Sequence, residues 1–295
     1  MKALITGDRG FIGRHFRKAL EARGYEVTGL DVKAAPSQDC LDYFRSTAAL
    51  RMDTHFDLVV HAAAVVKGRN TIDGSPLSTA VNLALDAAMF RWASIVRPGR
   101  VVYFSSSAVY PVQFQTGMIR TLAESDFNPG KAWIGQPDQV YGWSKVIGEV
   151  LAERLKELDV PVTIVRPFSG YGKDQDLDYP FPSYIQRAKD RADPFELWCG
   201  PCTRDFIHVD DVVDGTLAAV DHDWAGPVNL CTGRAVSFDE LANLVTAAAG
   251  YLPDFHHVAD TPTGPAFRVG DPSRLRRLYV PEVTLEEGIV RALEA

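Results

Sequence analysis

Thr6-Gly7-Asp8-Arg9-Gly10-Phe11-Ile12-Gly13 follows a short apolar run at residues 2–6 and leads into an apolar pattern with helical spacing that extends to about Arg23. Strand, glycine turn and helix, in this order, are the context that a dinucleotide-binding fingerprint requires. Gly7 permits a tight turn, Gly10 lets the backbone approach a pyrophosphate, and Gly13 lets the helix pack on the strand. The N–H groups at the start of the helix would then bind the anion. A glycine pattern alone also fits an ordinary strand–turn–helix. The rest of the chain is therefore needed to distinguish this from a dinucleotide-binding turn.

Further predicted strands alternate with helices along the chain. Residues 26–30 predict a strand that ends at Asp31, and residues 57–64 predict a buried strand that ends in alanines. A helix from about Thr79 to Val96 follows, and then a strand that ends at Ser105-Ser106-Ser107. This alternation predicts an α/β fold with a Rossmann-like, doubly wound parallel sheet and right-handed crossovers. Ligands bind at the carboxyl ends of such strands, where the glycine turn, the acid, the alanines and the serines all fall.

Asp31 favours NAD over NADP. An acid at the end of the second strand accepts hydrogen bonds from both ribose hydroxyls and repels a 2′-phosphate. Arg9 and Lys33 lie close enough in sequence to weaken this preference.

Tyr141 and Lys145 are four residues apart and therefore lie on one face of a predicted helix. A neighbouring ammonium stabilises a phenolate, which would let Tyr141 act as a general base near neutral pH. The spacing is common, and the alternative interpretation is a half-buried aromatic side chain beside a solvated charge.

Length and composition predict a soluble, cytoplasmic protein with one large domain, or one domain and a smaller lobe. The chain has 295 residues, 46% of them hydrophobic. It contains no apolar run as long as a membrane span, and the N-terminus has no charged-then-apolar leader. The net charge of −7 argues against a general affinity for nucleic acid. We therefore expect neither nucleic acid nor a membrane as a partner.

Trp198-Cys199-Gly200-Pro201-Cys202 has the letters of the thioredoxin redox motif, which in that family opens a helix directly after a strand. No helical pattern begins at Cys202, and the following residues 203–207 predict a strand. We interpret the match as coincidental, with reversible disulfide formation as the minor alternative. A zinc site is less expected still, because Cys40 and Cys231 are distant in sequence and form no second close pair.

Together, these residues resemble the extended short-chain dehydrogenase/reductase family, the nucleotide-sugar epimerases and dehydratases, over nearly the whole chain. The glycine spacing is that of the extended branch, and Tyr141 and Lys145 fit its tyrosine–lysine pair. Residues 105–110 look like its catalytic serine/threonine segment, and residues 204–211 like the segment that returns to the nucleotide domain. The resemblance implies an NAD-binding Rossmann domain at 1–168 and about 205–230, and a substrate-binding lobe at about 169–204 and 231–295.

The resemblance also implies a role for individual residues toward NAD. Asp31 would contact the adenosine ribose, Asp39 the adenine, and Lys145 the nicotinamide ribose. The full set expected against the cofactor is Gly7, Gly10, Phe11, Ile12, Gly13, Asp31, Asp39, Cys40, Ala62, Ala63, Ala64 and Lys145.

The expected catalytic residues are Ser106, Tyr141 and Lys145. Aligned on Val109-Tyr110, the segment places Ser106 as the catalytic hydroxyl, whereas aligned on Phe104 it places Ser107 there. We prefer Ser106, because Val-Tyr is the more regular landmark in the family. Its expected role is a hydrogen bond to the reacting sugar oxygen.

Four residues are expected to contact the substrate, a nucleotide-diphosphate sugar: Ser107, Ser169, Arg204 and Arg268. Arg204 and Arg268 are placed against the diphosphate, because a guanidinium fork suits phosphate oxygens. A surface salt bridge is the alternative for each, evenly balanced for Arg268, where the sequence from Pro262 to Pro265 is irregular. Ser169 stands where most of the family has asparagine.

Extra acid and base groups decide which reaction such an enzyme performs. The family's 4,6-dehydratases carry an Asp-Glu pair after the catalytic threonine, and its decarboxylases carry a Glu, but Ser107 and Ala108 stand at those positions. The chain also resembles the GDP-sugar 3,5-epimerases, whose cysteine and lysine align with Ala108 and Tyr179. The remaining serine, tyrosine, lysine and NAD suffice for a 4-epimerase that acts through a transient 4-keto sugar. The alternatives are an NAD(P)H-dependent 4-keto-sugar reductase, another nucleotide-sugar dehydratase or epimerase, and, as a minority, a non-catalytic dinucleotide sensor.

The resemblance further implies a homodimer, formed by the helix that holds Tyr141 and the helix from about Thr79 to Val96. Residues that could serve there are Ala84, Ala87, Ala88, Val146 and Val150. The insert from Gln113 to Gln139, which contains Trp133, is interpreted as an active-site lid, with a disordered loop as the alternative.

Overall fold

Six strands form the central sheet of the computed structural model, which describes residues 1–35, 39–46, 49–50, 55–66, 77–117, 119–131, 135–259 and 264–295. The strand order is β10-β5-β4-β3-β1-β2, and every neighbouring pair is parallel. The prediction of a doubly wound parallel sheet is therefore confirmed. The strands are β1 (Lys2–Thr6), β2 (Glu26–Leu30), β3 (Leu58–His61), β4 (Val101–Phe104), β5 (Val162–Pro167) and β10 (Pro227–Leu230).

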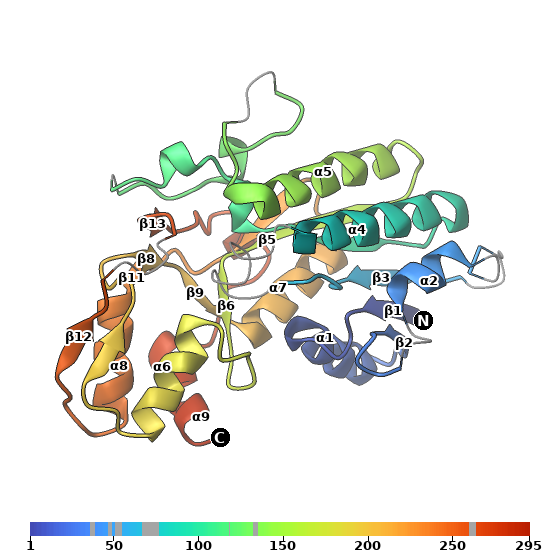
Figure 1. Ribbon diagram of the computed structural model, residues 1–295. Helices are drawn as coiled ribbons and strands as arrows, with labels where there is room; N and C mark the ends of the chain where they lie inside the picture. The colour runs from blue at the N-terminus through green and yellow to red at the C-terminus, as the bar shows by residue number, and fades with distance from the viewer. Residues whose placement is uncertain are drawn as a thin grey trace.

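Helices cover both faces of this sheet (Figure 1). On one face lie α2 (Cys40–Arg45), α4 (Leu77–Val96) and α5 (Gln139–Lys156), and on the other lie α1 (Phe11–Ala22) and α7 (Val209–Asp221). Successive strand side chains point to opposite faces, so Leu4 packs in the first core and Ala3 and Ile5 in the second. Burial on both sides explains why these strands read as continuous apolar runs.

A second group of elements lies beside the carboxyl ends of the strands (Figure 1). Its helices are α6 (Pro180–Lys189), α8 (Phe238–Ala248) and α9 (Leu285–Leu293), which share a third hydrophobic core. Its sheets are β11-β8-β13 (Val236–Ser237, Thr203–Arg204, Phe267–Arg268) and β12-β7 (Phe255–His257, Phe195–Leu197). The parallel pair β6 (Ser169–Tyr171) and β9 (Phe206–His208) connects this group with the main sheet.

The two prolines at positions 180 and 182 predict a loop at 179–183 that precedes a helix. This is wrong, because α6 already begins at Pro180 and Tyr179 is its N-cap. Proline is tolerated there, since the first helical residues lack an intrahelical partner for their N–H groups. The strand expected at 203–207 is two strands, interrupted at Asp205, whose carboxylate accepts hydrogen bonds from the backbone N–H groups of Thr232, Gly233 and Gly270.

The insert at 113–139 is anchored to the body of the protein. Leu122 and Phe127 are buried in a small core with Val109 and Tyr110, and Leu122 bridges Gly270. Short 3₁₀ helices occur at Ser107–Val109 (η2), Val112–Phe114 (η3), Glu124–Asp126 (η4) and Leu275–Arg277 (η5). Trp133, which we expected in a lid, lies outside the described residues.

None of the helices in the described part of the chain is both long enough and apolar enough to cross a bilayer.

Candidate active site

The glycine turn connects β1 to α1 with little room for side chains. Gly7 has φ +71° and donates a 2.7 Å hydrogen bond to the Leu30 carbonyl. A Cβ on Gly13 would collide with the Gly7 carbonyl, so the first turn of α1 packs directly on the glycine turn. The N-cap of α1 is Gly10, which has no side chain to occupy the first N–H groups of the helix. The helix N-terminus is therefore free of side-chain caps at the carboxyl end of β1.

Asp31 and Asp39 both bind backbone N–H groups next to this turn. The buried Asp31 carboxylate accepts hydrogen bonds from Arg9 N (3.0 Å) and Lys33 N (2.8 Å). Asp39 caps α2 by accepting a 2.7 Å hydrogen bond from Leu41 N. Cys40 is buried, its Sγ lies 3.5 Å from the Leu30 carbonyl oxygen, and burial raises the pKa of its thiol to about 12. Only the backbone of Cys40 can therefore face a ligand.

The half-buried alanines 62–64 lie against the glycine turn. Ala63 N donates a 3.2 Å hydrogen bond to the Thr6 hydroxyl. A Cβ on Gly7 would come within 2.9 Å of the Ala63 backbone. The alanine run and the glycine turn thus form one continuous surface at the point where the strand order reverses between β1 and β3.

The start of α5 packs against the serine segment. A Cβ on Gly142 would lie 2.5 Å from the Ala108 carbonyl oxygen, and Asp138 N donates a 2.8 Å hydrogen bond to that same oxygen. This close approach brings the helix turn that carries the half-buried Tyr141 onto η2. Lys145, one turn later, is only 3% exposed.

The three serines at the end of β4 have different partners. Ser105 donates a 2.6 Å hydrogen bond to Glu149, which also forms a buried ion pair with Arg166. Ser107 is buried, at 5% exposed. Ser106 is the more exposed of the two candidates, and its Oγ accepts a 3.1 Å hydrogen bond from Ala108 N. The Ser106 hydroxyl proton is therefore still available for donation.

A buried acid that the sequence analysis missed lies beneath Lys145. Asp86, on α4 and 2% exposed, accepts a 2.7 Å hydrogen bond from the Tyr103 hydroxyl and lies 3.1 Å from His61 Nε2. Lys145 Nζ is 5.1 Å from the centre of the Tyr103 ring. Burial alone would raise the pKa of Asp86, but the Lys145 charge and the contacts with His61 and Tyr103 lower it below the ordinary value. The sequence did contain a signal for this residue, because Asp86 is an acid on the apolar face of the helix predicted from about Thr79 to Val96.

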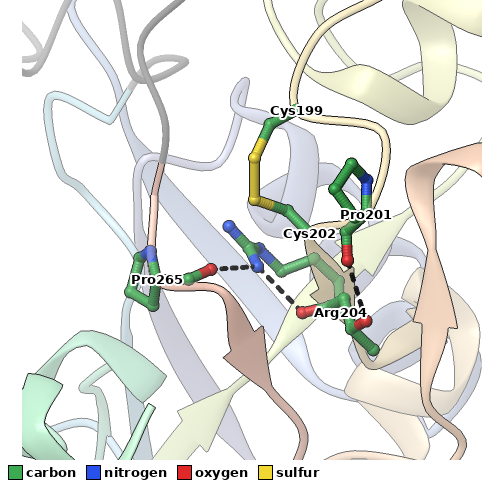
Figure 2. Close-up of a disulfide and its surroundings, with 6 residues drawn as sticks. Cys199, Pro201, Cys202, Arg204 and Pro265 are labelled. Carbon is green, nitrogen blue, oxygen red and sulfur yellow. Dashed lines mark hydrogen bonds between the residues drawn. A yellow bond between two sulfur atoms is a disulfide. The ribbon is translucent and has the colours of Figure 1, made fainter. Parts of the chain in front are cut away.

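Arg204 and Arg268 are paired across neighbouring strands β8 and β13. Arg204 Nη1 donates hydrogen bonds to the carbonyls of Pro265 (2.7 Å) and Thr203 (2.8 Å), as Figure 2 shows. Arg268 donates to Gln115 (2.5 Å) and to Asp138 (2.7 Å), and its side chain is 13% exposed. Arg268 thus forms a salt bridge, as the alternative interpretation predicted, but this ion pair is mostly buried and does not lie on the surface. Ser169 is half-buried on β6, and its N–H donates to the Asp205 carbonyl.

Cys199 and Cys202 are joined by a disulfide (Figure 2). As predicted, no helix begins at Cys202, since β8 starts at the next residue. The sequence favoured a coincidental match, with disulfide formation as the minor alternative. The structure contains the disulfide.

Residues 3–231 match the model of the NAD dependent epimerase/dehydratase family. The chain belongs to this family. The predicted membership of the extended short-chain dehydrogenase/reductases is thereby confirmed.

Relatives within the NAD-dependent epimerase/dehydratase family differ in their reactions. The chain is 27% identical to GDP-mannose 3,5-epimerase of Arabidopsis thaliana (98% of this chain, 80% of the relative). It is 28% identical to dTDP-4-dehydro-6-deoxy-D-allose reductase of a Streptomyces species (92% and 88%), and 26% identical to UDP-glucose 4-epimerase of Mycolicibacterium smegmatis (100% and 98%). The crystal structure of Thermus thermophilus UDP-glucose 4-epimerase with NAD has the same fold, with a TM-score of 0.81 at 23% identity over 100% of this chain and 98% of that one.

The family is NAD-dependent, and the residues of this member fit the cofactor. The uncapped start of α1 suits a pyrophosphate, because its N–H groups and the helix dipole favour an anion. Each Asp31 oxygen has one backbone partner and keeps acceptor capacity for a ribose hydroxyl. The alanine run leaves a wall without bulky side chains. A dinucleotide at this edge of the sheet would extend from Asp31 toward Lys145.

Proposed function

We propose that this family member is a nucleotide-sugar 4-epimerase. The observation that carries this proposal is the close packing of Gly142 on the Ala108 carbonyl, which unites the serine segment with the Tyr141 helix. Ala108 itself has only a methyl side chain, at a position where other enzymes of the family carry an additional acid–base group.

The proposed chemistry needs a single acid–base group, which takes a proton from the C4 hydroxyl of the sugar and later returns it. Tyr141 accepts the proton of the C4 hydroxyl while the sugar becomes a 4-keto sugar, and returns it when the opposite face has been reduced. In this proposal the buried Lys145 stabilises the phenolate form of Tyr141 and binds the nicotinamide ribose. Ser106 donates a hydrogen bond to the reacting oxygen. Bound NAD supplies the hydride acceptor for the oxidation and, once reduced, the hydride donor.

Arg204 and Arg268 are the groups that we place against the diphosphate of the substrate. Their registered positions on β8 and β13 mean that both side chains leave the small sheet on the same face. Ser107 and Ser169 are placed against the sugar. Because Asp138 pairs with Arg268 and lies three residues before Tyr141, the phosphate contact and the proton-transfer site share one local framework.

The positions that would support other reactions carry groups without acid–base function. Ala108 stands where the 3,5-epimerases have a cysteine. Tyr179 stands where they have a lysine, and burial, followed by the Tyr141 charge, raises the pKa of its phenol well above the usual range. A phenol with a raised pKa is a poor base near neutral pH. This argues against inversion at carbons next to the ketone.

The second candidate is an NAD(P)H-dependent 4-keto-sugar reductase, which the 28% identity to a dTDP-sugar reductase favours. Asp31 favours the epimerase over an NADPH-dependent reductase, because its carboxylate would lie against the 2′-phosphate of NADP. Arg9, whose backbone N–H binds Asp31 and whose side chain is 63% exposed and lies 3.8 Å from Asp8, is a cation that would be available to such a phosphate.

The test is incubation of the purified protein with a panel of UDP- and GDP-hexoses, followed by analysis of the sugar. The proposal predicts inversion at C4 without added reductant. No inversion, together with consumption of added NADPH in the presence of a 4-keto sugar, would replace it with the reductase. Tyr141→Phe should abolish turnover and leave NAD bound.

We also propose a homodimer that forms through α4 and α5, which lie side by side in Figure 1. An exposed apolar stripe follows α5, with helical spacing, at Val140, Trp143, Ile147 and Val150, which are 39–53% exposed. Val146 does not belong to it, because its side chain is 5% exposed and packs in an internal core. On α4, the exposed Val81, Ala87 and Ile95 extend the apolar surface, whereas Ala84 and Ala88 are half-buried.

A further inference from the structure

The Cys199–Cys202 disulfide closes the turn that leads directly into β8 and Arg204 (Figure 2). The two cysteines differ in accessibility, since Cys199 is half-buried and Cys202 is 5% exposed. Trp198, next to Cys199, is 39% exposed. Cys199 is therefore the cysteine that is more open to a thiol in solution, and Cys202 is the more shielded of the two. This asymmetry is what thiol–disulfide exchange needs, because exchange requires access to one sulfur and leaves the other as leaving group.

The turn is bonded to the start of α8. The Gly200 carbonyl accepts a 3.0 Å hydrogen bond from Asp239 N, and the Cys202 carbonyl accepts a 3.1 Å hydrogen bond from Phe238 N. Gly200 packs so closely here that an added Cβ would collide with the Asp239 carboxylate. A change in the shape of this turn is therefore transmitted to the first residues of α8.

Phe238 links the same turn to Arg204. Its backbone N–H binds the Cys202 carbonyl, and its ring lies 5.3 Å from the Arg204 guanidinium carbon. The other contacts of that guanidinium include the Pro265 carbonyl. Arg204 is thus placed by elements that the disulfide holds on two sides, namely β8, which follows Cys202, and Phe238.

We propose that Cys199 and Cys202 form a reversible redox site, and that its oxidised state sets the affinity of Arg204 for a nucleoside diphosphate. The second half rests on the proposed function, which places Arg204 at the diphosphate. The reductant is a low-molecular-weight thiol or a protein dithiol. Its thiolate attacks the Cys199 sulfur, the S–S bond breaks, and Cys202 leaves as a thiolate that takes up a proton. A second thiolate of the reductant then attacks the reductant's sulfur in the mixed disulfide. Cys199 leaves as a thiolate and takes up a proton, the reductant becomes a disulfide, and two electrons have entered the protein.

The first test measures the thiols directly, without reference to activity. The intact protein is equilibrated in glutathione buffers of graded ratio, quenched with a maleimide and digested for mass spectrometry. The peptide that contains Cys199 and Cys202 should convert between zero and two labels in a single transition. Cys40 and Cys231, both buried, are the internal reference and should not change together with it. A pair that stays free under oxidising conditions, or stays closed in excess dithiothreitol, would overturn the proposal.

The second test measures the binding of UDP and GDP by calorimetry, with the protein oxidised and with the protein reduced. The Kd of the diphosphate that binds should rise about fivefold on reduction, a typical coupling between sites. The double variant Cys199→Ser with Cys202→Ser should bind with the reduced value in both buffers. Equal Kd values in the two states, or no binding in either, would overturn the coupling. Because this is equilibrium binding, a failure to observe C4 inversion would reject the proposed function and leave this result standing.

Discussion

The Tyr103 hydroxyl donates a 2.7 Å hydrogen bond to Asp86 Oδ2, and this buried contact lies directly beneath Lys145. The second Asp86 oxygen lies 3.1 Å from His61 Nε2, and His61 Nδ1 lies 2.8 Å from the Thr6 hydroxyl. Threonine, histidine, aspartate and tyrosine thus form a hydrogen-bonded chain from the glycine turn to the lysine. We propose that Asp86 is a positioning residue that acts through Lys145 on the proposed proton-transfer site.

Asp86→Asn should shift the pH dependence of kcat to lower pH by about one unit. Loss of the negative charge leaves the field of Lys145 less compensated, which stabilises the phenolate of Tyr141. The ionisable groups next to Asp86 and Tyr103 include His61 and, further along α5, Glu149, and Tyr179 interacts with Tyr141 itself. The control is Asp42→Asn on the exposed surface of α2, which should leave the profile unchanged. A profile that keeps its midpoints while only kcat falls would assign Asp86 a purely structural role.

Gly13→Ala should reduce the free energy of unfolding by about 1–3 kcal/mol. The added methyl group collides with the Gly7 carbonyl, so α1 has to move away from the turn. NAD binding should weaken in parallel, as calorimetry will show. Gly117→Ala is the matched control, since a Cβ there meets nothing within 4 Å, and urea unfolding should place it within about 0.5 kcal/mol of the wild type. Equal stability of the two variants would contradict the packing described for Gly13.

His15 should make the stability of the protein depend on pH near neutrality. Its ring lies 3.2 Å from Asp174 on one side and 3.2 Å from Asp210 on the other. Burial alone lowers the pKa of His15, but the two carboxylates outweigh it and the net pKa is raised. A raised pKa gives stability that is fully present below the unfolded value of about 6.5 and is lost as pH rises through the folded value.

The corresponding variant is His15→Asn. The difference in Tm between the wild type and this variant should be larger at pH 6 than at pH 8.5. Thermal unfolding followed by circular dichroism at the two pH values measures it. A difference that stays constant, or that grows at pH 8.5, would show that the two carboxylates do not hold a charged imidazole.

Ile147→Glu should convert the proposed dimer into a monomer. A carboxylate in the middle of the apolar stripe on α5 would be buried without a partner at the interface, which costs several kcal/mol. Sedimentation velocity should show twice the chain mass of 32.5 kDa for the wild type and the chain mass for the variant. Leu252→Glu, at a residue 87% exposed in the other part of the protein, should remain dimeric. A monomeric wild type would refute the interface.

The sequence was sufficient for the parts of the structure that depend on local signals. Gly7, Gly10 and Gly13 predicted the turn because its conformation and packing exclude side chains over a few consecutive residues. The parallel sheet followed from alternating apolar patterns. Tyr141 and Lys145 could be placed together on one helix because their spacing is local, and α5 contains both.

Contacts between elements that are distant in sequence could not be predicted from local patterns. Asp86 meets Tyr103, His61 and Lys145 from four different elements, and no spacing in sequence encodes that meeting. The carboxylate that pairs with Arg268 belongs to Asp138, which is 130 residues away in sequence. The Cys199–Cys202 pair was discounted because it opens no helix, but a turn held by α8 brings the Cα atoms to 5.4 Å just as well.

The most direct test of the proposed 4-epimerase is a proton NMR analysis of the reaction in D₂O, with the UDP- or GDP-hexose that the protein binds. Only one carbon should react, because Ala108 and Tyr179 provide no base for the neighbouring carbons. We expect inversion at C4 with no deuterium at C3, C4 or C5. Deuterium at C3 or C5, or a sugar that returns with its C4 configuration unchanged, would contradict it.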